Sequence, residues 1–208
     1  MRKYIPENAK LIPAEAECKF QGELFDVYQW PQEMFDGSTA TFEMLRREDT
    51  VVIIAVLTAG EQRCLGKVAE GEDAEDKVVI TYQTQPHQDW FYDYPGGRHD
   101  SPDETELEAA KRELREETGL SFANWKLVEV HQPFTKIDWL VYTFVATDLV
   151  GQVAQQLDAG EKIEVLEATL DELREYAKKP NAKYLMPGFM RGVKNLNELR
   201  ELSALYEY

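Results

Sequence analysis

One stretch in the middle of the chain, residues 94–120, constrains the fold more than any other, because it predicts a single helix with recognisable ends. Residues 101–104 (SPDE) offer Ser and Asp as capping residues, and their acidic side chains suit the positive end of a helix. Gly119 follows Thr118 and is a typical helix stop, since glycine readily takes the left-handed conformation. We therefore expect a helix that starts near Ser101 and ends at Gly119.

This predicted helix carries three glutamates on one face. Glu113, Glu116 and Glu117 lie side by side, because residues three and four positions apart are neighbours on a helix. The adjoining apolar face comprises Leu107, Ala110 and Leu114. The side that faces solvent comprises Glu108, Lys111 and Arg115. Clustered carboxylates repel one another, at about a few tenths of a kcal/mol for each pair. A hard divalent cation such as Mg²⁺, which prefers oxygen ligands, would hold them together; the alternative interpretation is a solvated acidic face.

The residues around the helix fit a known pattern. The stretch resembles the Nudix box, G-x5-E-x7-R-E-U-x-E-E-x-G-U, in which U is a bulky apolar residue. The matching positions are Glu104, Arg112, Glu113, Leu114, Glu116, Glu117, Gly119 and Leu120. One departure is visible, because six residues rather than five separate Gly97 from Glu104. Either the loop is one residue longer, or Arg98 stands in place of the glycine.

The resemblance implies a fold and a metal site. It implies an α/β fold, a Nudix-type α/β/α sandwich with a mixed sheet, over about residues 50–180. The expected ligands of Mg²⁺, or of Mn²⁺, are Glu113, Glu116, Glu117 and the carbonyl group of Gly96. Bound Mg²⁺ would neutralise phosphate charge and lower the pKa of a coordinated water. The residues expected to have structural roles are Gly97, Glu104, Arg112 and Gly119; Arg112 would hold Glu104 or another carboxylate, or form a plain ion pair on the helix.

An acidic loop late in the chain, residues 158–164, carries the candidate general base. In the ADP-ribose pyrophosphatase branch of the family, a similar loop before the last strand supplies a catalytic glutamate. Glu161 stands at the matching place, and Glu164 is the fallback. The alternative is that both are ordinary loop residues of an acidic protein. The catalytic candidates are therefore Glu117 and Glu161.

Substrate contacts follow from the same resemblance, which is to ADP-ribose pyrophosphatases and nucleotide-sugar hydrolases. Those enzymes are typically homodimers that exchange N-terminal strands. By this resemblance Arg46 or Arg47 would bind the nucleotide, together with Trp30 or another aromatic residue of the N-terminal sheet; ordinary sheet packing is the alternative. The segment 83–85 (QTQ) stands where the family often has Q-x-R, so we expect Arg98 to replace the missing arginine.

The rest of the chain divides into two parts. Residues 1–48 carry short apolar stretches between turn residues, which predict a small antiparallel sheet. Such a sheet needs a partner to bury its face, either the main domain or a second copy of the chain; the resemblance favours pairing of two chains. Residues 49–208 would form the Nudix domain with a C-terminal helix. Within it we expect strands at 51–57, 78–84, 90–94, 125–134, 139–147 and 163–170, helices at 171–178 and 184–206, and loops at 58–77 and 148–162.

Composition limits the partners of this chain. Its 208 residues carry a net charge of −16, which argues against nucleic acid and against anionic membranes. Phosphate substrates are compatible with that charge, because a metal ion reverses the local sign. Cys18 and Cys64 form no CxxC pattern, and the N-terminus lacks the apolar run of a signal peptide. The longest apolar run, 51–57, is too short to span a bilayer. We expect a cytoplasmic protein.

The leading hypothesis is Mg²⁺-dependent hydrolysis of the pyrophosphate linkage in a nucleoside diphosphate derivative, with ADP-ribose giving AMP and ribose 5-phosphate as the first candidate. The same chemistry on another nucleotide sugar, on NADH or on a nucleoside triphosphate is the second. The third hypothesis is of another class, a Nudix-like nucleotide-binding regulator without turnover.

Overall fold

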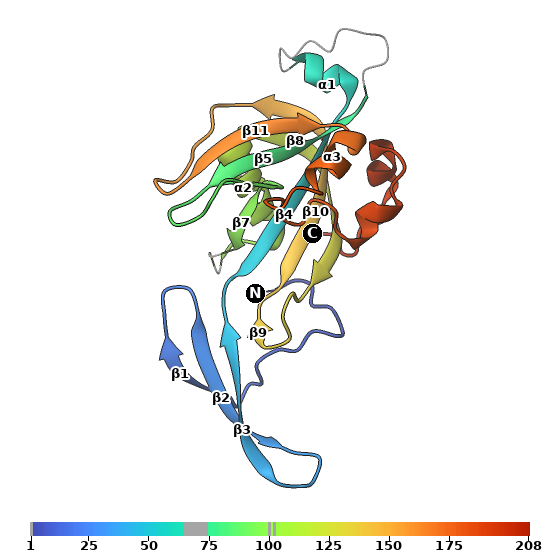
Figure 1. Ribbon diagram of the computed structural model, residues 1–208. Coiled ribbons are helices and arrows are strands. Elements are labelled where there is room, and N and C mark those ends of the chain that lie inside the picture. The colour runs from blue at the N-terminus through green and yellow to red at the C-terminus, as the bar shows by residue number, and fades with distance from the viewer. Residues whose placement is uncertain (1, 65–74, 100, 102) are drawn as a thin grey trace.

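A mixed sheet with helices on both of its faces forms the centre of the molecule, and a smaller sheet extends from one end (Figure 1). The computed structural model describes residues 2–64, 75–99, 101 and 103–208. The larger sheet comprises β4 (Asp49–Leu57), β5 (Lys77–Thr84), β6 (Phe91–Asp93), β7 (Gly96–His99), β8 (Leu120–His131), β10 (Val141–Gln152) and β11 (Lys162–Ala168). The smaller one comprises β1 (Glu17–Gln21), β2 (Asp26–Glu33), β3 (Thr39–Arg46) and β9 (Ile137–Asp138). The helices are α1 (Ala59–Cys64), α2 (Glu106–Thr118), α3 (Leu170–Tyr176) and the 3₁₀ helices η1 (Gly188–Gly192) and η2 (Leu196–Glu201).

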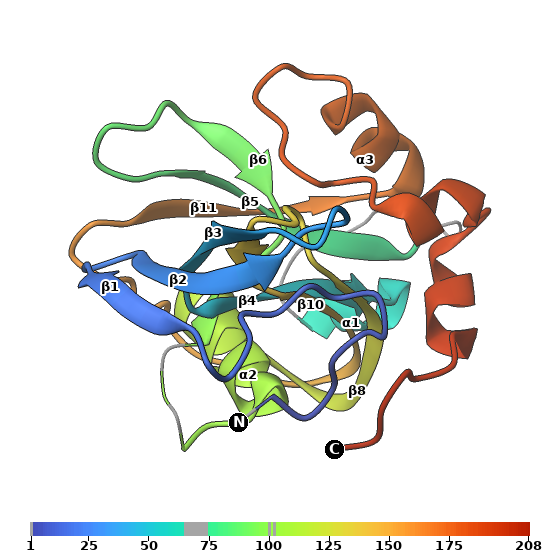
Figure 2. The same cartoon turned by 90° about the horizontal axis from the view of Figure 1, so that it is seen from below.

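Two hydrophobic clusters form the core, one on each face of the larger sheet. Along β4 the side chains alternate, so Val51 and Ile53 pack on the α2 side, and Ile54 and Val56 pack on the side of α3 and the C-terminal segment. A strand covered on both faces reads as a continuous apolar run, which explains the sequence of β4. Figure 2 shows α2 and α3 on opposite sides of the sheet. The predicted α/β/α sandwich is confirmed.

The small N-terminal sheet is also confirmed. Strands β1, β2 and β3 are antiparallel neighbours in chain order, and β9 pairs with β3 in parallel. Strand β2 continues through Pro31 to Glu33. All residues of β1 are exposed, as is the side chain of Phe35 in the turn after β2. Pairing of two chains through residues 1–48 stays a prediction.

Two predictions about the segments outside the core strands are wrong. Within the expected loop 58–77, Ala59–Cys64 forms a helix, because Thr58 and Glu61 cap it with reciprocal hydrogen bonds from backbone to side chain. The rest of that loop, 65–74, lies outside the described residues. The expected helix at 184–206 is replaced by the two short 3₁₀ helices, since Pro187 and the glycines of η1 do not sustain a longer helix.

Element boundaries near the central helix also differ from the prediction. The helix α2 starts at Glu106 with Thr105 as its N-cap, not near Ser101. Gly96 and Gly97, which precede the helix, belong to the short strand β7, which pairs with β4. Strand β8 begins directly after Gly119, and β10 extends to Gln152 into the predicted loop. Among the helices described, none is long and apolar enough to cross a membrane.

Candidate active site

The ends of α2 fix the register of the acidic helix. At its start, the Thr105 hydroxyl accepts the Glu108 N–H, and the Glu108 carboxylate accepts the Thr105 N–H, which together form a capping box. At its end, Gly119 has φ 75° and its N–H donates to the carbonyl of Arg115. Because a residue with a Cβ is strained at this φ, glycine gives the helix a defined last turn. The acidic face is therefore held at one position relative to the sheet.

Strand β7 brings two glycines against this acidic face. The Gly96 N–H donates to Glu117 Oε2 over 2.8 Å. A Cβ at Gly97 would lie 2.4 Å from the carboxyl group of Glu113, so no larger residue fits there without displacing that side chain. The glycines thus allow the backbone of β7 to approach two of the three predicted metal ligands. Coordination of Mg²⁺ or Mn²⁺ by the Gly96 carbonyl stays a prediction.

Arg112 connects the acidic residues of the motif. Its Nε and Nη2 donate to the two carboxylate oxygens of Glu104, over 3.0 and 3.2 Å. Its Nη1 donates to Glu113 over 2.8 Å and to Glu116 over 3.2 Å. The bidentate pair with Glu104 fixes the guanidinium plane, because Arg and carboxylate match in a two-bond geometry. Glu104, which precedes the helix, thereby holds Arg112 against the two helix carboxylates.

Glu117 is the most deeply buried of the three helix glutamates and is only 3% exposed. Its pKa lies well above the ordinary value, first because of burial and then because of the nearby Glu113, Glu161 and Asp93. Burial also raises the pKa of Glu113, against the opposing effect of Arg112. Burial raises the pKa of Asp93 to about 7. Glu113, Glu161 and Asp93 thus stand close enough to Glu117 to contribute to its raised pKa.

This donor set fits a hard divalent cation. Among the residues that the structure describes, no three His, Cys, Asp or Glu side chains are already arranged as a metal-binding group. The chemistry nevertheless suits a cation, because its charge would offset the burial and mutual repulsion that raise the pKa values of Glu113 and Glu117. Glu116, the third predicted ligand, also pairs with Arg112, and its side chain is more exposed than that of Glu113. These three glutamates are the residues that could hold Mg²⁺ or Mn²⁺.

The loop before β11 places Glu161 near α2. The side-chain amide of Gln155 donates to the carbonyl of Glu117 over 2.5 Å and to that of Ile163 over 3.3 Å, so it connects the end of α2 to β11. Glu161 lies in the loop directly before β11 and is close enough to Glu113 and Glu117 to contribute to their raised pKa values. Val165 of β11 packs in the cluster under α2. Glu164 is exposed and shares the opposite face with Leu166, which packs in the C-terminal cluster. Of the two candidate bases, the structure therefore brings Glu161 to the acidic face and not Glu164.

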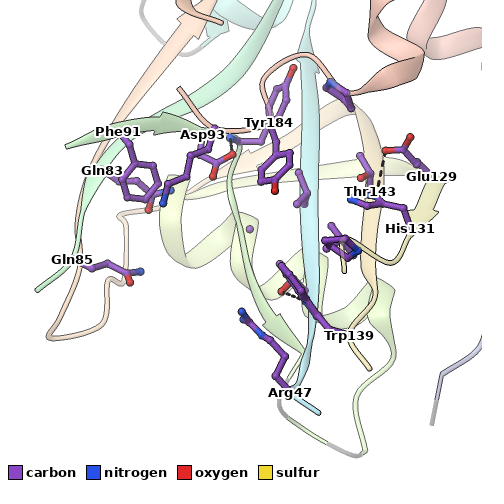
Figure 3. A pocket seen from close by; sticks show the side chains of 18 of the residues that line it. Arg47, Gln83, Gln85, Phe91, Asp93, Glu129, His131, Trp139, Thr143 and Tyr184 are labelled. Carbon is purple, nitrogen blue, oxygen red and sulfur yellow. Dashed lines mark hydrogen bonds and ion pairs between the residues drawn. The ribbon is translucent and has the colours of Figure 1, made fainter. Parts of the chain in front are cut away.

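A pocket of about 310 Å³ opens beside the acidic face, where the larger sheet splits (Figure 3). Strand β4 pairs with β5 only at Val56 and Leu57, and with β7 from Asp49 to Val52. Between these two regions β5 and β6 diverge from β4, and the pocket lies in the gap. Gly96 lines the pocket and also binds Glu117. A molecule in the pocket would therefore lie next to the carboxylates.

Arg47 and Trp139 form one end of this pocket in Figure 3. Arg47 lies between β3 and β4, and its guanidinium carbon is 4.4 Å from the centroid of the Trp139 ring. The Trp139 N–H donates to Thr50, which fixes the ring. Arg47 Nε is buried and has no hydrogen-bond partner among the described residues. Burial, with the nearby Arg98, lowers the pKa of Arg47. A buried donor without a partner is suited to an anionic ligand.

The other predicted substrate residues lie in different places. Arg46 stacks over the Tyr28 ring at 4.7 Å and forms an ion pair with Asp138, so its guanidinium already has partners. Arg98 is exposed and lines a smaller pocket together with Arg46 and Arg47. Trp30 is 7% exposed and packs against Phe42 of the small sheet, and it does not line the pocket beside the acidic face.

Sequence reasoning did not single out several pocket residues. Trp139 is the first residue of a predicted strand with no motif around it, and Asp93 precedes the glycines without a pattern that marks it. Lys183 lines the pocket from a stretch between two predicted helices, where no motif marks it. Gln83 of β5 and Gln85 directly after it also line the pocket, and Gln85 stands where the family often has an arginine. Their place in this segment was the available signal.

Fold and site together define a class of protein. It is an α/β/α protein in which a helix that carries carboxylates and a strand that carries glycines adjoin a pocket. This arrangement suits metal-assisted hydrolysis of phosphoric anhydrides. A family model for the NUDIX domain matches residues 66–189, more than half of the chain. The chain belongs to the Nudix family, and its class of enzyme is Nudix pyrophosphohydrolase.

Solved structures with a similar fold are known. The structure of an ADP compounds hydrolase superposes with a TM-score of 0.61 at 17% identity, and the match covers 81% of this chain and 83% of that one. MutT, from a study of Aliivibrio salmonicida and Vibrio cholerae, gives a TM-score of 0.44 at 18% identity, over 62% of this chain and 85% of that one. At these identities the first similarity shows the shared fold. No curated protein matches the chain.

Proposed function

We propose that this enzyme hydrolyses the pyrophosphate linkage of a nucleoside diphosphate derivative with Mg²⁺ or Mn²⁺, and that ADP-ribose, giving AMP and ribose 5-phosphate, is its first candidate substrate. The observation that carries the proposal is that Gly96 both lines the pocket and binds Glu117, so the pocket and the carboxylates form one site. The acidic loop with Glu161 supports the ADP-ribose branch, as does the fold shared with a protein named as an ADP compounds hydrolase.

The roles of the residues follow from their positions. When bound, Mg²⁺ would offset charge on the phosphate oxygens and increase the acidity of a coordinated water. Glu113, Glu116 and Glu117 would hold the ion, and Arg112 would keep Glu113 and Glu116 oriented. Water attacks one phosphorus, the bond from that phosphorus to the bridging oxygen breaks, and the other phosphate leaves. Glu161 would accept the proton of the attacking water.

Arg47 would bind the diphosphate, because it lines the pocket and its Nε is buried without a hydrogen-bond partner among the described residues. We expect Arg47→Gln to raise KM about 10-fold or more with a smaller change in kcat, since a lost charge-assisted hydrogen bond weakens binding by roughly that factor. Steady-state kinetics on the two variants Arg47→Gln and Arg46→Gln measure this. Arg46 is the matched control, because Tyr28 and Asp138 already engage it. Equal KM values for Arg47→Gln and the wild type would exclude Arg47 from binding.

A substrate panel tests the proposed function. Purified protein is incubated with Mg²⁺ and, separately, with ADP-ribose, other nucleotide sugars, NADH and nucleoside triphosphates, and the products are separated by chromatography. We expect AMP and ribose 5-phosphate from ADP-ribose, and no product once EDTA is added. Faster turnover of another compound would reassign the substrate and keep the chemistry. If no compound released a monophosphate, the protein would be a binding module, despite its complete set of glutamates.

A further inference from the structure

The C-terminal segment 181–187 forms one wall of the pocket, and its backbone is attached to β6. The Tyr92 N–H donates to the carbonyl of Asn181 over 2.9 Å, and the Lys183 N–H donates to the carbonyl of Tyr92 over 2.8 Å. The side chain of Asn181 donates to the carbonyl of Trp90 over 2.9 Å. These bonds place the segment beside the strand edge as an added strand would lie. The position of Lys183 is therefore set by backbone hydrogen bonds.

The chain turns sharply after this attachment. Tyr184 has φ 47°, in the left-handed region that residues other than glycine rarely adopt. The following carbonyl, that of Leu185, accepts a hydrogen bond from the buried Tyr94 hydroxyl over 2.8 Å, which holds the turn in place. Lys183 and Tyr184 both line the pocket. In Figure 3 Tyr184 lies near Asp93, at the end of the pocket away from Arg47 and Trp139.

Lys183 is the cation at this end of the pocket. Among the described residues that line the pocket, the lysines and arginines are Arg47 and Lys183. The Lys183 ammonium lies 3.6 Å from the centroid of the Phe91 ring, which positions it in the absence of an anion. Its charge also acts on Asp93, and Asp93 in turn acts on Glu117. The protein has a net charge of −16, which repels an anionic substrate. Cations inside the pocket would attract such a substrate locally.

We propose that Lys183 is a substrate-binding residue, which binds a phosphate oxygen of the diphosphate at the Asp93 end of the pocket while Arg47 binds at the other end. This inference rests on the proposed function for its substrate class. It gives a function to a segment that lies outside the Nudix box and that is fixed against β6 with a left-handed turn at Tyr184. The alternative is that Lys183 serves only to pack on Phe91.

Binding of inorganic pyrophosphate in the presence of Mg²⁺, measured by titration calorimetry, tests the proposal. Lys183→Met keeps an unbranched side chain over Phe91 and removes the charge, and Lys183→Arg restores the charge. Lys179→Met is the matched control, because Lys179 stacks on Tyr92 and Tyr176 and does not line the pocket. We expect Kd to increase about 10- to 100-fold for Lys183→Met, to change less than about 3-fold for Lys183→Arg, and to stay unchanged for Lys179→Met.

Two results would overturn the proposal: an unchanged Kd for Lys183→Met, or no binding of pyrophosphate by the wild-type protein. A larger Kd in both Lys179→Met and Lys183→Met would also overturn it, because the effect would then reflect net charge and not the site. Failure of the proposed function gives a different result, namely charge-dependent pyrophosphate binding at Lys183 with no hydrolysis of any compound in the panel. The two proposals are therefore tested separately.

Discussion

Glu117→Gln is expected to reduce kcat roughly 10³-fold while making the metal-free protein more stable. The activity falls because the variant loses a proposed metal ligand next to the reacting phosphate, and the loss of one such electrostatic contact has effects of about this size. The fold should persist, since the glutamine oxygen can still accept the Gly96 N–H that Glu117 accepts. Stability should rise on the order of 1 kcal/mol, or about 2–4 °C in Tm, because a buried charge near other carboxylates is removed.

The pH dependence of stability follows from the direction of the Glu117 shift. In the folded protein its pKa is well above the ordinary value of 4.5. The folded state therefore holds the proton more tightly than the unfolded state. This stabilising contribution is complete below the unfolded pKa and is lost as the pH rises through the folded pKa. The metal-free wild type should lose stability over that range, and Glu117→Gln should lose less.

Thermal denaturation with EDTA at several pH values measures this effect, and kinetics with the best substrate of the panel measure turnover. Glu201→Gln, a change at an exposed glutamate of η2, is the control for a general change of net charge. Added Mg²⁺ should raise the Tm of the wild type more than that of Glu117→Gln. A variant with normal kcat, or with lower stability than the wild type at neutral pH, would contradict this account of Glu117.

Glu161→Gln should reduce kcat about 100-fold or more with little change in KM or in stability. The expected size is that of a lost general base. Stability should change little, because the carboxylate of Glu161 makes only a 3.3 Å bond to the Asp158 N–H of its own loop, which a glutamine oxygen can replace. Turnover of the variant should also depend less on pH across the range in which the wild-type activity rises.

Glu164→Gln provides the matched control, because Glu164 lies on the opposite face of β11 and is exposed. Steady-state kinetics and pH–rate profiles for both variants distinguish a general base from an acidic loop residue. A wild-type kcat in Glu161→Gln would remove Glu161 from the mechanism. A large loss in Glu164→Gln alone would transfer the role to Glu164 and would disagree with the strand register described above.

Sequence reasoning located the helix that carries the acidic face and its end at Gly119. These follow from local chemistry, namely residue spacing on a helix and the conformational freedom of glycine. The sandwich around the helix was expected from the resemblance to the Nudix family. The start of the helix was misplaced by several residues, because Ser101, Asp103 and Thr105 are all acceptable caps. Thr105 is the cap in the structure, where Glu108 completes the reciprocal pair of hydrogen bonds. The local preference for capping residues therefore allows several helix starts, and the pair of hydrogen bonds between Thr105 and Glu108 selects one of them.

The sequence by itself determined that three glutamates share one helix face and that a glycine pair precedes them. Only the tertiary structure decided that this face adjoins a pocket, that Arg47 and Trp139 form one end of it, and that Lys183 lies at the other. The physical reason is the range of the interactions. Caps and helix faces depend on neighbours within a few residues, whereas the pocket exists because β4 exchanges β5 for β7 as its partner and a distant segment pairs with β6.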